Sequence, residues 1–137
     1  MDPLFKAQRI AVSGMKAQGM RLRVLAENLA NADTLPSAPG EAPYQRKIIT
    51  FRNVLDRDLG ARTVRVDKVR SDPSGFVRRF EPRHPAADAD GYVLAPNVDP
   101  MIELANMREA LRSYEAGLNV IRAAKDMLKR ASDMLRD

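Results

Sequence analysis

The chain has 137 residues and carries 23 Lys and Arg against 18 Asp and Glu, a formal net charge of +5. It has no cysteine, which excludes a disulfide scaffold, a thiolate metal site and a cysteine nucleophile. With no tryptophan and 5% aromatic residues, its core must be filled by Leu, Met, Val and Ala. Apolar runs fall short of the roughly 20 residues that cross a bilayer, and the first residues lack the apolar stretch of a cleaved secretory signal, so we expect no membrane insertion.

The N-terminal region predicts one long amphipathic helix. Asp2 can cap it, and Pro3 suits the first helical position. Mostly apolar residues recur every seven positions: Met1, Gln8, Met15, Leu22 and Leu29 in one row, and Leu4, Ala11, Gln18 and Leu25 in the other. Gly14 and Gly19 each cost about 1 kcal/mol relative to Ala, which is tolerable if another segment packs closely there.

The middle of the chain predicts a loop followed by short strands. Four Gly and Pro residues within 33–44 stop both helix and strand. Strand-like patterns then occupy residues 44–51, 63–69, 76–80 and 91–94. We expect these strands to form one small antiparallel patch lying against the helices.

The C-terminal region predicts a second long helix. Asp99 and Pro100 again supply a cap and a first-turn proline, and Glu103 lies favourably near the helix N-terminus. Apolar residues recur every seven positions over four heptads, which favours a coiled coil: Met107, Tyr114, Ile121, Leu128 and Leu135, with Leu104, Leu111 and Leu118 in the partner row and Ala110, Gly117, Ala124 and Ala131 on the adjoining ridge.

These elements predict a mainly α fold, with the terminal helices paired as an antiparallel, coiled-coil hairpin and a small β-rich, Pro-containing middle. The expected divisions are an N-terminal helical region 1–32, a loop and β segment 33–98, and a C-terminal helical region 99–137. The middle is too short to cover both helices, so we expect apolar surface to remain for neighbouring subunits. The predicted subunit-interface residues are Leu4, Ala11, Met15, Leu22, Leu25, Leu29, Met107, Leu111, Tyr114, Leu118, Ile121, Leu128 and Leu135.

The sequence offers little chemistry for an enzyme. His84, the single histidine, lies before Pro85 in a turn and is interpreted as structural. The acidic stretch at Asp88 and Asp90 lacks ligands at the first and last positions of a calcium loop. We therefore predict no catalytic residues, no metal site and no cofactor.

Two motifs in the first helix carry a family resemblance. Ser13, Gly14 and Met15 form one, and Asn28, Leu29, Ala30 and Asn31 form the other. Both resemble the signatures of bacterial flagellar rod and hook axial proteins. Further matches lie at residues 43–47, 84–98, 105–107 and 112–116, and with them the chain resembles the proximal-rod family, basal-body rod protein C. The Asn28 and Asn31 pair is expected to cap the helix or to touch a neighbouring subunit.

The resemblance implies a structural subunit of the proximal rod, a helical drive shaft that transmits torque and encloses the export channel. It implies partners: other copies of the chain, other rod proteins, MS-ring and export-gate proteins at the rod base, and the rod–ring junction protein. It also implies a place in the periplasm, reached through the flagellar type III apparatus without a cleaved signal. The basic composition leaves one alternative, a nucleic-acid-binding helical hairpin, which predicts strongly salt-sensitive DNA binding.

Overall fold

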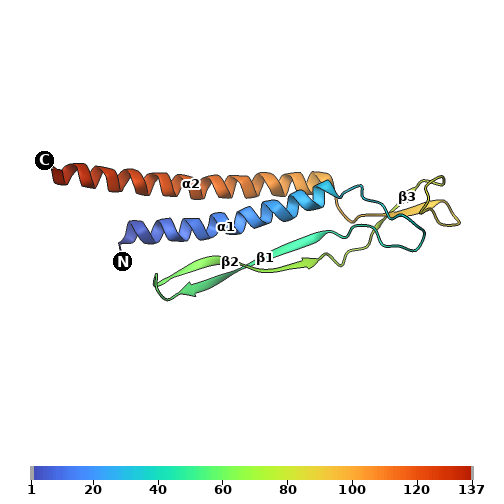
Figure 1. The fold of residues 1–137 in the computed structure, drawn as a ribbon, viewed down its shortest axis with the longest axis horizontal. Coiled ribbons are helices and arrows are strands. Elements are labelled where there is room, and N and C mark those ends of the chain that lie inside the picture. The colour runs from blue at the N-terminus through green and yellow to red at the C-terminus, as the bar shows by residue number, and fades with distance from the viewer. Residues whose placement is uncertain (1, 137) are drawn as a thin grey trace. The chain divides into compact units, whose positions relative to one another are not determined.

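The computed structural model describes residues 2–136, so the predicted heptad position Met1 lies outside the described residues. The elements follow one another as α1 Pro3–Ala30, β1 Lys47–Asp56, β2 Ala61–Ser71, β3 Val77–Phe80, β4 Tyr92–Ala95 and α2 Pro100–Arg136 (Figure 1). Two terminal helices and a short β middle confirm the coarse fold prediction. Among residues 2–136, neither helix has an apolar stretch long enough to span a bilayer.

Both helices begin where the sequence predicted. Asp2 Oδ1 accepts a hydrogen bond from the Leu4 N–H at 2.9 Å, and Asp99 Oδ1 accepts one from the Met101 N–H at 3.0 Å. Each aspartate therefore caps its helix, and the proline that follows occupies the first turn, where no N–H is needed.

The strands form two separate two-stranded sheets, β1–β2 and β3–β4, so the prediction of a single patch is wrong. Each sheet joins strands that are neighbours in the chain. Long-range pairing between the two hairpins would have required register information that short alternating patterns do not contain.

The chain folds into two compact units. The first unit contains residues 2–22, 50–68 and 108–136, and the second contains residues 23–49 and 69–107. Each unit includes part of both helices.

In the first unit, α1 and α2 run antiparallel. Arg21 pairs with Glu109 at 3.6 Å, whereas the earlier residue Met15 lies against the later residue Gly117. A Cβ on Gly117 would stand 2.7 Å from Met15 Cγ, so the absence of a side chain permits this close helix approach. Close packing was expected at Gly14 and Gly19, but nothing lies within 4 Å of a Cβ built at either position.

The buried line of α2 is the small-residue ridge and not the predicted leucine row. Ala110 and Ala124 are buried, while Leu111 is 47% exposed. Small residues let the helices approach closely, and this leaves the larger side chains at the edges of the contact. The described buried apolar residues are Ala, Val and Leu, so methionine does not fill the core as expected.

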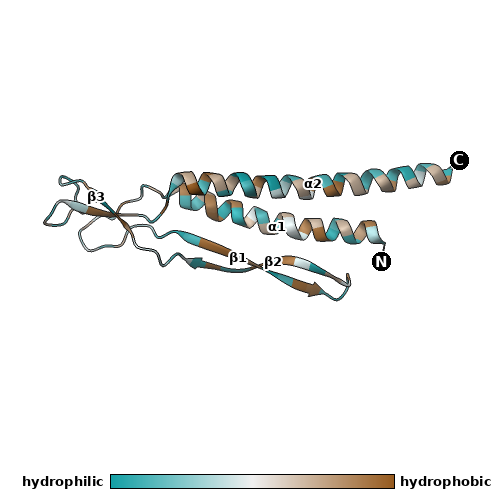
Figure 2. Ribbon diagram, turned by 180° about the vertical axis from the view of Figure 1, so that it is seen from behind, coloured by the Kyte–Doolittle hydropathy of each residue, from teal (hydrophilic) through white to brown (hydrophobic). Residues whose placement is uncertain are grey.

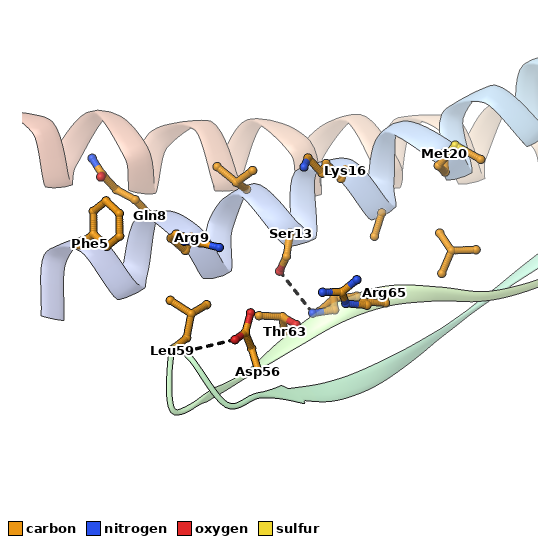
Figure 3. A pocket seen from close by; sticks show the side chains of 14 residues that line it. Phe5, Gln8, Arg9, Ser13, Lys16, Met20, Asp56, Leu59, Thr63 and Arg65 are labelled. Carbon is orange, nitrogen blue, oxygen red and sulfur yellow. Dashed lines mark hydrogen bonds between the residues drawn. The ribbon is translucent and has the colours of Figure 1, made fainter. Parts of the chain in front are cut away.

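The tip of the β1–β2 hairpin lies beside α1 in this unit, with Leu59 pointing toward the helix and 2% exposed (Figure 3). Asp56 Oδ1 accepts hydrogen bonds from the N–H groups of Asp58 and Leu59 at 3.0 and 3.2 Å. Gly60 follows with a φ of 63°, a left-handed conformation that glycine adopts without strain. Local turn chemistry therefore positions Leu59 against the helix.

In the second unit, β3 and β4 pair antiparallel, with Phe80 opposite Tyr92. Val93 and Ala95 point inward and are 1% exposed. The rings of Phe80 and Tyr92 meet edge to face, 5.2 Å apart, on the outer side. The side chains of β4 thus alternate between exposed and buried, as period-two alternation predicts, whereas Val77 of β3, opposite Ala95, is 53% exposed.

Candidate assembly interface

A buried polar cluster lies in the second unit and is formed by Asn28, Tyr44, Arg46, Asp72, Asn97 and Glu103. Asn28, at the end of α1, is 0% exposed and uses both ends of its amide. Its Oδ1 accepts from the Lys47 N–H at 2.9 Å and from the Tyr44 hydroxyl at 2.7 Å. Its Nδ2 donates to the Lys47 carbonyl at 2.9 Å and to Glu103 Oε2 at 3.4 Å. The amide thereby imitates a paired strand at the first residue of β1.

Glu103 is the buried charge of this cluster. It is 0% exposed in the first turn of α2, and its Oε1 accepts from Arg46 Nε. Arg46 Nη1 also donates to Asp72 Oδ2 at 3.0 Å. A buried carboxylate is tolerable because a guanidinium and an amide both satisfy it.

Backbone groups complete the cluster. Asn97 Oδ1 accepts from the Arg46 N–H at 2.7 Å, and its Nδ2 donates to the Ser74 carbonyl at 3.1 Å. The Asp72 N–H donates to the Arg46 carbonyl at 2.7 Å. The chain before β1, the chain after β2 and the chain before α2 are therefore held together by one hydrogen-bonded network.

The environment shifts the pKa values of Tyr44, Arg46 and Asp72 in this cluster, and those of Tyr44 and Asp72 bear on the hydrogen bonds described above. Burial, reinforced by the negative charges of Glu27 and Glu103, raises the pKa of the Tyr44 hydroxyl from 10.0 to about 12. Hydrogen bonds from the Ser74 backbone and then from Arg46 lower the pKa of Asp72 below its ordinary value. Tyr44 is therefore neutral and Asp72 ionised at neutral pH, as their hydrogen bonds require.

The Ser-Gly-Met motif has a comparable role in the first unit. The Ser13 hydroxyl donates to the Ile10 carbonyl at 2.7 Å and accepts from the Val64 N–H of β2 at 3.3 Å (Figure 3). Gly14 borders open space and Met15 packs at Gly117. This motif therefore attaches the middle of β2 to α1.

The two asparagines of the second motif, Asn28 and Asn31, bond to different parts of the chain. Asn31 Nδ2 donates to the Glu27 carbonyl at 2.9 Å, and the same carbonyl accepts from the Asn31 N–H at 3.1 Å, so the side chain reinforces the last turn of α1. Asn28 does not cap the helix, because its amide bonds β1 and Glu103. Leu29 is half-buried and Ala30 is exposed at the last helical position.

The predicted interface residues differ in how far this chain covers them. Leu25 is buried within the chain. The half-buried ones are Leu4, Ala11, Met15, Leu22, Leu29, Met107, Leu118 and Ile121. The exposed ones are Leu111, Tyr114, Leu128 and Leu135, the last at 89%. Figure 2 shows that apolar residues continue among polar ones along α2 as far as its described C-terminal end.

A second apolar surface lies between α1 and β2 in the first unit. It is a groove of about 590 Å³ whose exposed apolar side chains include Phe5, Val12 and Met20. Arg9 and Lys16 also line it (Figure 3).

The remaining candidates have local roles. His84 Nδ1 accepts from the Ala86 N–H at 3.0 Å, which fits its structural interpretation. Asp88 Oδ1 accepts from the N–H groups of Tyr92 and Asp90, both at 2.9 Å. The hydrogen bond from the Tyr92 N–H, and after it the one from Asp90, lower the pKa of Asp88. Both side chains therefore serve the turn that leads into β4.

Sequence reasoning missed the role of Glu103, although a signal was present. Glu103 lies seven residues before Ala110 and so begins the same ridge that continues through Gly117 and Ala124. Extending that row by one heptad toward the N-terminus predicts a buried acid, which in turn requires a cationic partner from elsewhere in the chain.

Comparison with known proteins agrees with both ends of this architecture. Residues 9–35 match the family model described as "Flagella basal body rod protein", and residues 89–134 match "Flagellar basal body rod FlgEFG protein C-terminal". Flagellar basal-body rod protein FlgC of Agrobacterium fabrum is 46% identical over 99% of this chain and 98% of its own length. The FlgC proteins of Bacillus subtilis and Salmonella typhimurium are 34% and 40% identical, over 95% and 87% of this chain and 97% and 88% of their own lengths. The chain belongs to the family of flagellar basal-body rod protein FlgC and is a structural subunit of the basal-body rod, not an enzyme.

Proposed function

We propose that this subunit joins the rod through the apolar side chains that its terminal helices leave uncovered, with other copies of the chain and other rod proteins as neighbours. The observation that carries the proposal is the exposure of a series of apolar side chains along α2: Leu111, Tyr114, Val120, Met127, Leu128 and Leu135. Apolar side chains at helical spacing on one long element form a continuous surface that another helix can cover.

The contacts in this proposal are heterologous. One surface of a subunit meets a different surface of the next, and such contacts build an open helical assembly when the rotation does not close. Long helices packed side by side in this way resist shear. The assembled shaft would transmit torque and enclose the export channel, and the heptad rows would pack as coiled coils between subunits.

Export through the flagellar type III apparatus, without a cleaved signal, and a periplasmic location complete the proposal. The core supports the export step, because the contact between α1 and α2 relies on small residues such as Ala110 and Ala124. Such a core buries little apolar area per residue and unfolds readily. The MS-ring, export-gate and rod–ring junction proteins are the further neighbours that we infer at the rod base.

The nucleic-acid alternative has less support. Several cations are paired with acids within the chain, among them Arg46 with Asp72, Lys47 with Glu27, and Arg79 with Asp33. Membership of the rod family accounts for the motifs at both ends, which a nucleic-acid-binding hairpin leaves unexplained.

The test is a double substitution, Leu111→Gln with Leu135→Gln, in a motile bacterium that lacks its own copy of the gene. Glutamine has nearly the same helix propensity as leucine, and both side chains are exposed, so the free energy of unfolding should change by less than about 1 kcal/mol. Swimming in soft agar and rod assembly should be lost. The matched control, Asn119→Gln on the same helix, should swim normally, and a motile double variant would refute the proposal.

A further inference from the structure

The turn before β4 contains a chemically labile pair of residues. Asp90 and Gly91 form the only place in the 137 residues where an aspartate or an asparagine precedes a glycine. At such a pair the glycine nitrogen can attack the aspartyl side chain, because glycine has no Cβ to hinder the approach. The Asp90 side chain is exposed, and within residues 2–136 it makes no hydrogen bond or ion pair that would hold its carboxylate in place.

The reaction at this pair needs no reagent other than water. The Gly91 nitrogen bonds to Asp90 Cγ, and the amide proton leaves with a carboxyl hydroxyl as water, which closes a five-membered succinimide. Water then adds to the former main-chain carbonyl carbon of Asp90 and breaks its bond to the Gly91 nitrogen. The main chain now runs through Cγ as an isoaspartate and is longer by one methylene group.

The fold requires glycine at position 91. Gly91 has a φ of 88°, a conformation that residues with a side chain rarely adopt. A Cβ there would also stand 2.9 Å from Phe80 Cε2 and 3.1 Å from Pro82 Cβ. The turn therefore imposes the residue that makes Asp90 labile.

The same turn occupies the nitrogen that would attack. Gly91 is buried, and its N–H donates to the Asp88 carbonyl at 3.1 Å. Asp88 Oδ1 holds the residues on either side of Gly91, because it accepts from the Asp90 and Tyr92 N–H groups at 2.9 Å each. The nitrogen can attack only after its N–H has lost the proton, as in amide hydrogen exchange, and a buried, hydrogen-bonded N–H loses it when the turn opens locally.

Strand β3 supports Asp88 from its other oxygen. Arg78 Nη2 lies 3.7 Å from Asp88 Oδ2, and the Arg78 guanidinium lies 4.3 Å from the centre of the Tyr92 ring. The Asp88 carboxylate is thus bonded to the turn through one oxygen and paired with β3 through the other. An isoaspartate at position 90 would lengthen the chain between Asp88 and Tyr92, and so would displace Tyr92 from its pairing with Phe80.

We propose that Asp90 is a site of isoaspartate formation, and that Asp88 protects it in the folded chain by holding the turn closed over the Gly91 N–H. The modification forms in chains that have unfolded or have opened at this turn, and it disrupts the start of β4. The inference concerns the second unit alone and does not depend on how the subunit contacts its neighbours.

The test measures isoaspartate at residue 90 during incubation of the purified full chain at neutral pH. Trypsin releases this residue in a peptide of residues 84–108, in which electron-transfer fragmentation distinguishes isoaspartate from aspartate of the same mass. The folded chain should form isoaspartate several-fold more slowly than the same chain in guanidinium chloride. Equal rates, or no isoaspartate in the unfolded chain, would overturn the inference. Asp90→Glu is the control for the assay, because glutamate would have to close a slower six-membered ring.

Substitutions at Asp88 test the protective role. Asp88→Ala removes the side-chain acceptor, so the folded variant should form isoaspartate several-fold faster than the natural chain. Asp88→Asn keeps an Oδ1 acceptor and should restore the slow rate. The matched control is Asp56→Ala, which removes an aspartate that accepts from two N–H groups in the same way at the β1–β2 turn and should leave the rate at Asp90 unchanged.

A rate in Asp88→Ala no faster than in Asp56→Ala would refute the protection by Asp88. Circular dichroism shows whether each variant is folded. If Asp88→Ala does not fold, hydrogen exchange of the Gly91 amide in the natural chain decides instead. Exchange several-fold slower than in guanidinium chloride supports the closed turn, and exchange at the unfolded rate overturns it.

Discussion

Replacing Asn28 by alanine should be among the most damaging single substitutions in the second unit. The Asn28 amide makes four hydrogen bonds, two with the backbone of Lys47 and one each with Tyr44 and Glu103. Asn28→Ala removes all four and leaves a space where the amide stood. Because Glu103 is 0% exposed, water cannot readily replace the lost amide donor there.

The expected magnitude follows from which groups remain buried. A stranded buried partner costs about 1–3 kcal/mol, and a charged one lies at the upper end. Lys47 and Tyr44 are half-buried and recover part of their hydrogen bonding from water. We therefore expect a loss of about 3–4 kcal/mol, which is a large part of the ~5–15 kcal/mol that stabilises a typical domain.

The assay is urea unfolding followed by far-ultraviolet circular dichroism, with Asn31→Ala as the matched control. Asn31 is half-buried and donates to the Glu27 carbonyl at the end of α1, so its loss should cost about 1 kcal/mol or less. Tyr44→Phe combined with Asn28→Ala should cost less than the sum of the two, because they share a hydrogen bond. Equal losses for Asn28→Ala and Asn31→Ala would show that the buried cluster does not hold β1 to α1.

Two further predictions concern packing and pH. Gly117→Val should lower the free energy of unfolding by about 1–3 kcal/mol, because the valine side chain would enter the space of Met15. Gly19→Val is the control and should be nearly neutral, because a Cβ there meets nothing within 4 Å. Urea unfolding midpoints compare the two variants, and equal midpoints would contradict the close helix approach. Because the folded pKa of Tyr44 is raised, its contribution to stability is complete below pH 10 and is lost as pH rises from 10 to about 12. Relative to Tyr44→Phe, the natural chain should lose about 1 kcal/mol of its free energy of unfolding over that range, a value reduced because Tyr44 is partly exposed to solvent. Parallel pH profiles of the two unfolding free energies would refute this prediction.

The two family motifs acquire a physical meaning from these contacts. Ser13 bonds the backbone of β2 in the first unit, and Asn28 bonds the backbone of β1 in the second. Within their own units, both motifs attach the hairpin to α1. The residues that identify the family are therefore positioned to hold the fold together, while the surfaces proposed for assembly lie on the exposed apolar side chains.

The sequence by itself determined the local features of this protein. Both helix starts, at Pro3 and Pro100, follow from an aspartate cap and a first-turn proline, and those interactions span two residues. The presence of four strands follows from period-two alternation between turn residues, although β1 and β2 run over 10 and 11 residues and end beyond the predicted 44–51 and 63–69. The family follows from contiguous motifs. The predicted subunit contacts and the division into three regions remain predictions.

The tertiary structure decided which residues meet across long separations. The sequence assigned Glu103 to the helix dipole, but Arg46, 57 residues away, and Asn28, 75 residues away, bury it in a hydrogen-bonded network. The tertiary structure also buries the ridge of Ala110 and Ala124 in place of the leucine row, and it contains two small sheets in place of one. Periodicity specifies that a helix has an apolar side, but the choice of contact line depends on how closely two backbones can approach, which is a property of the pair of helices.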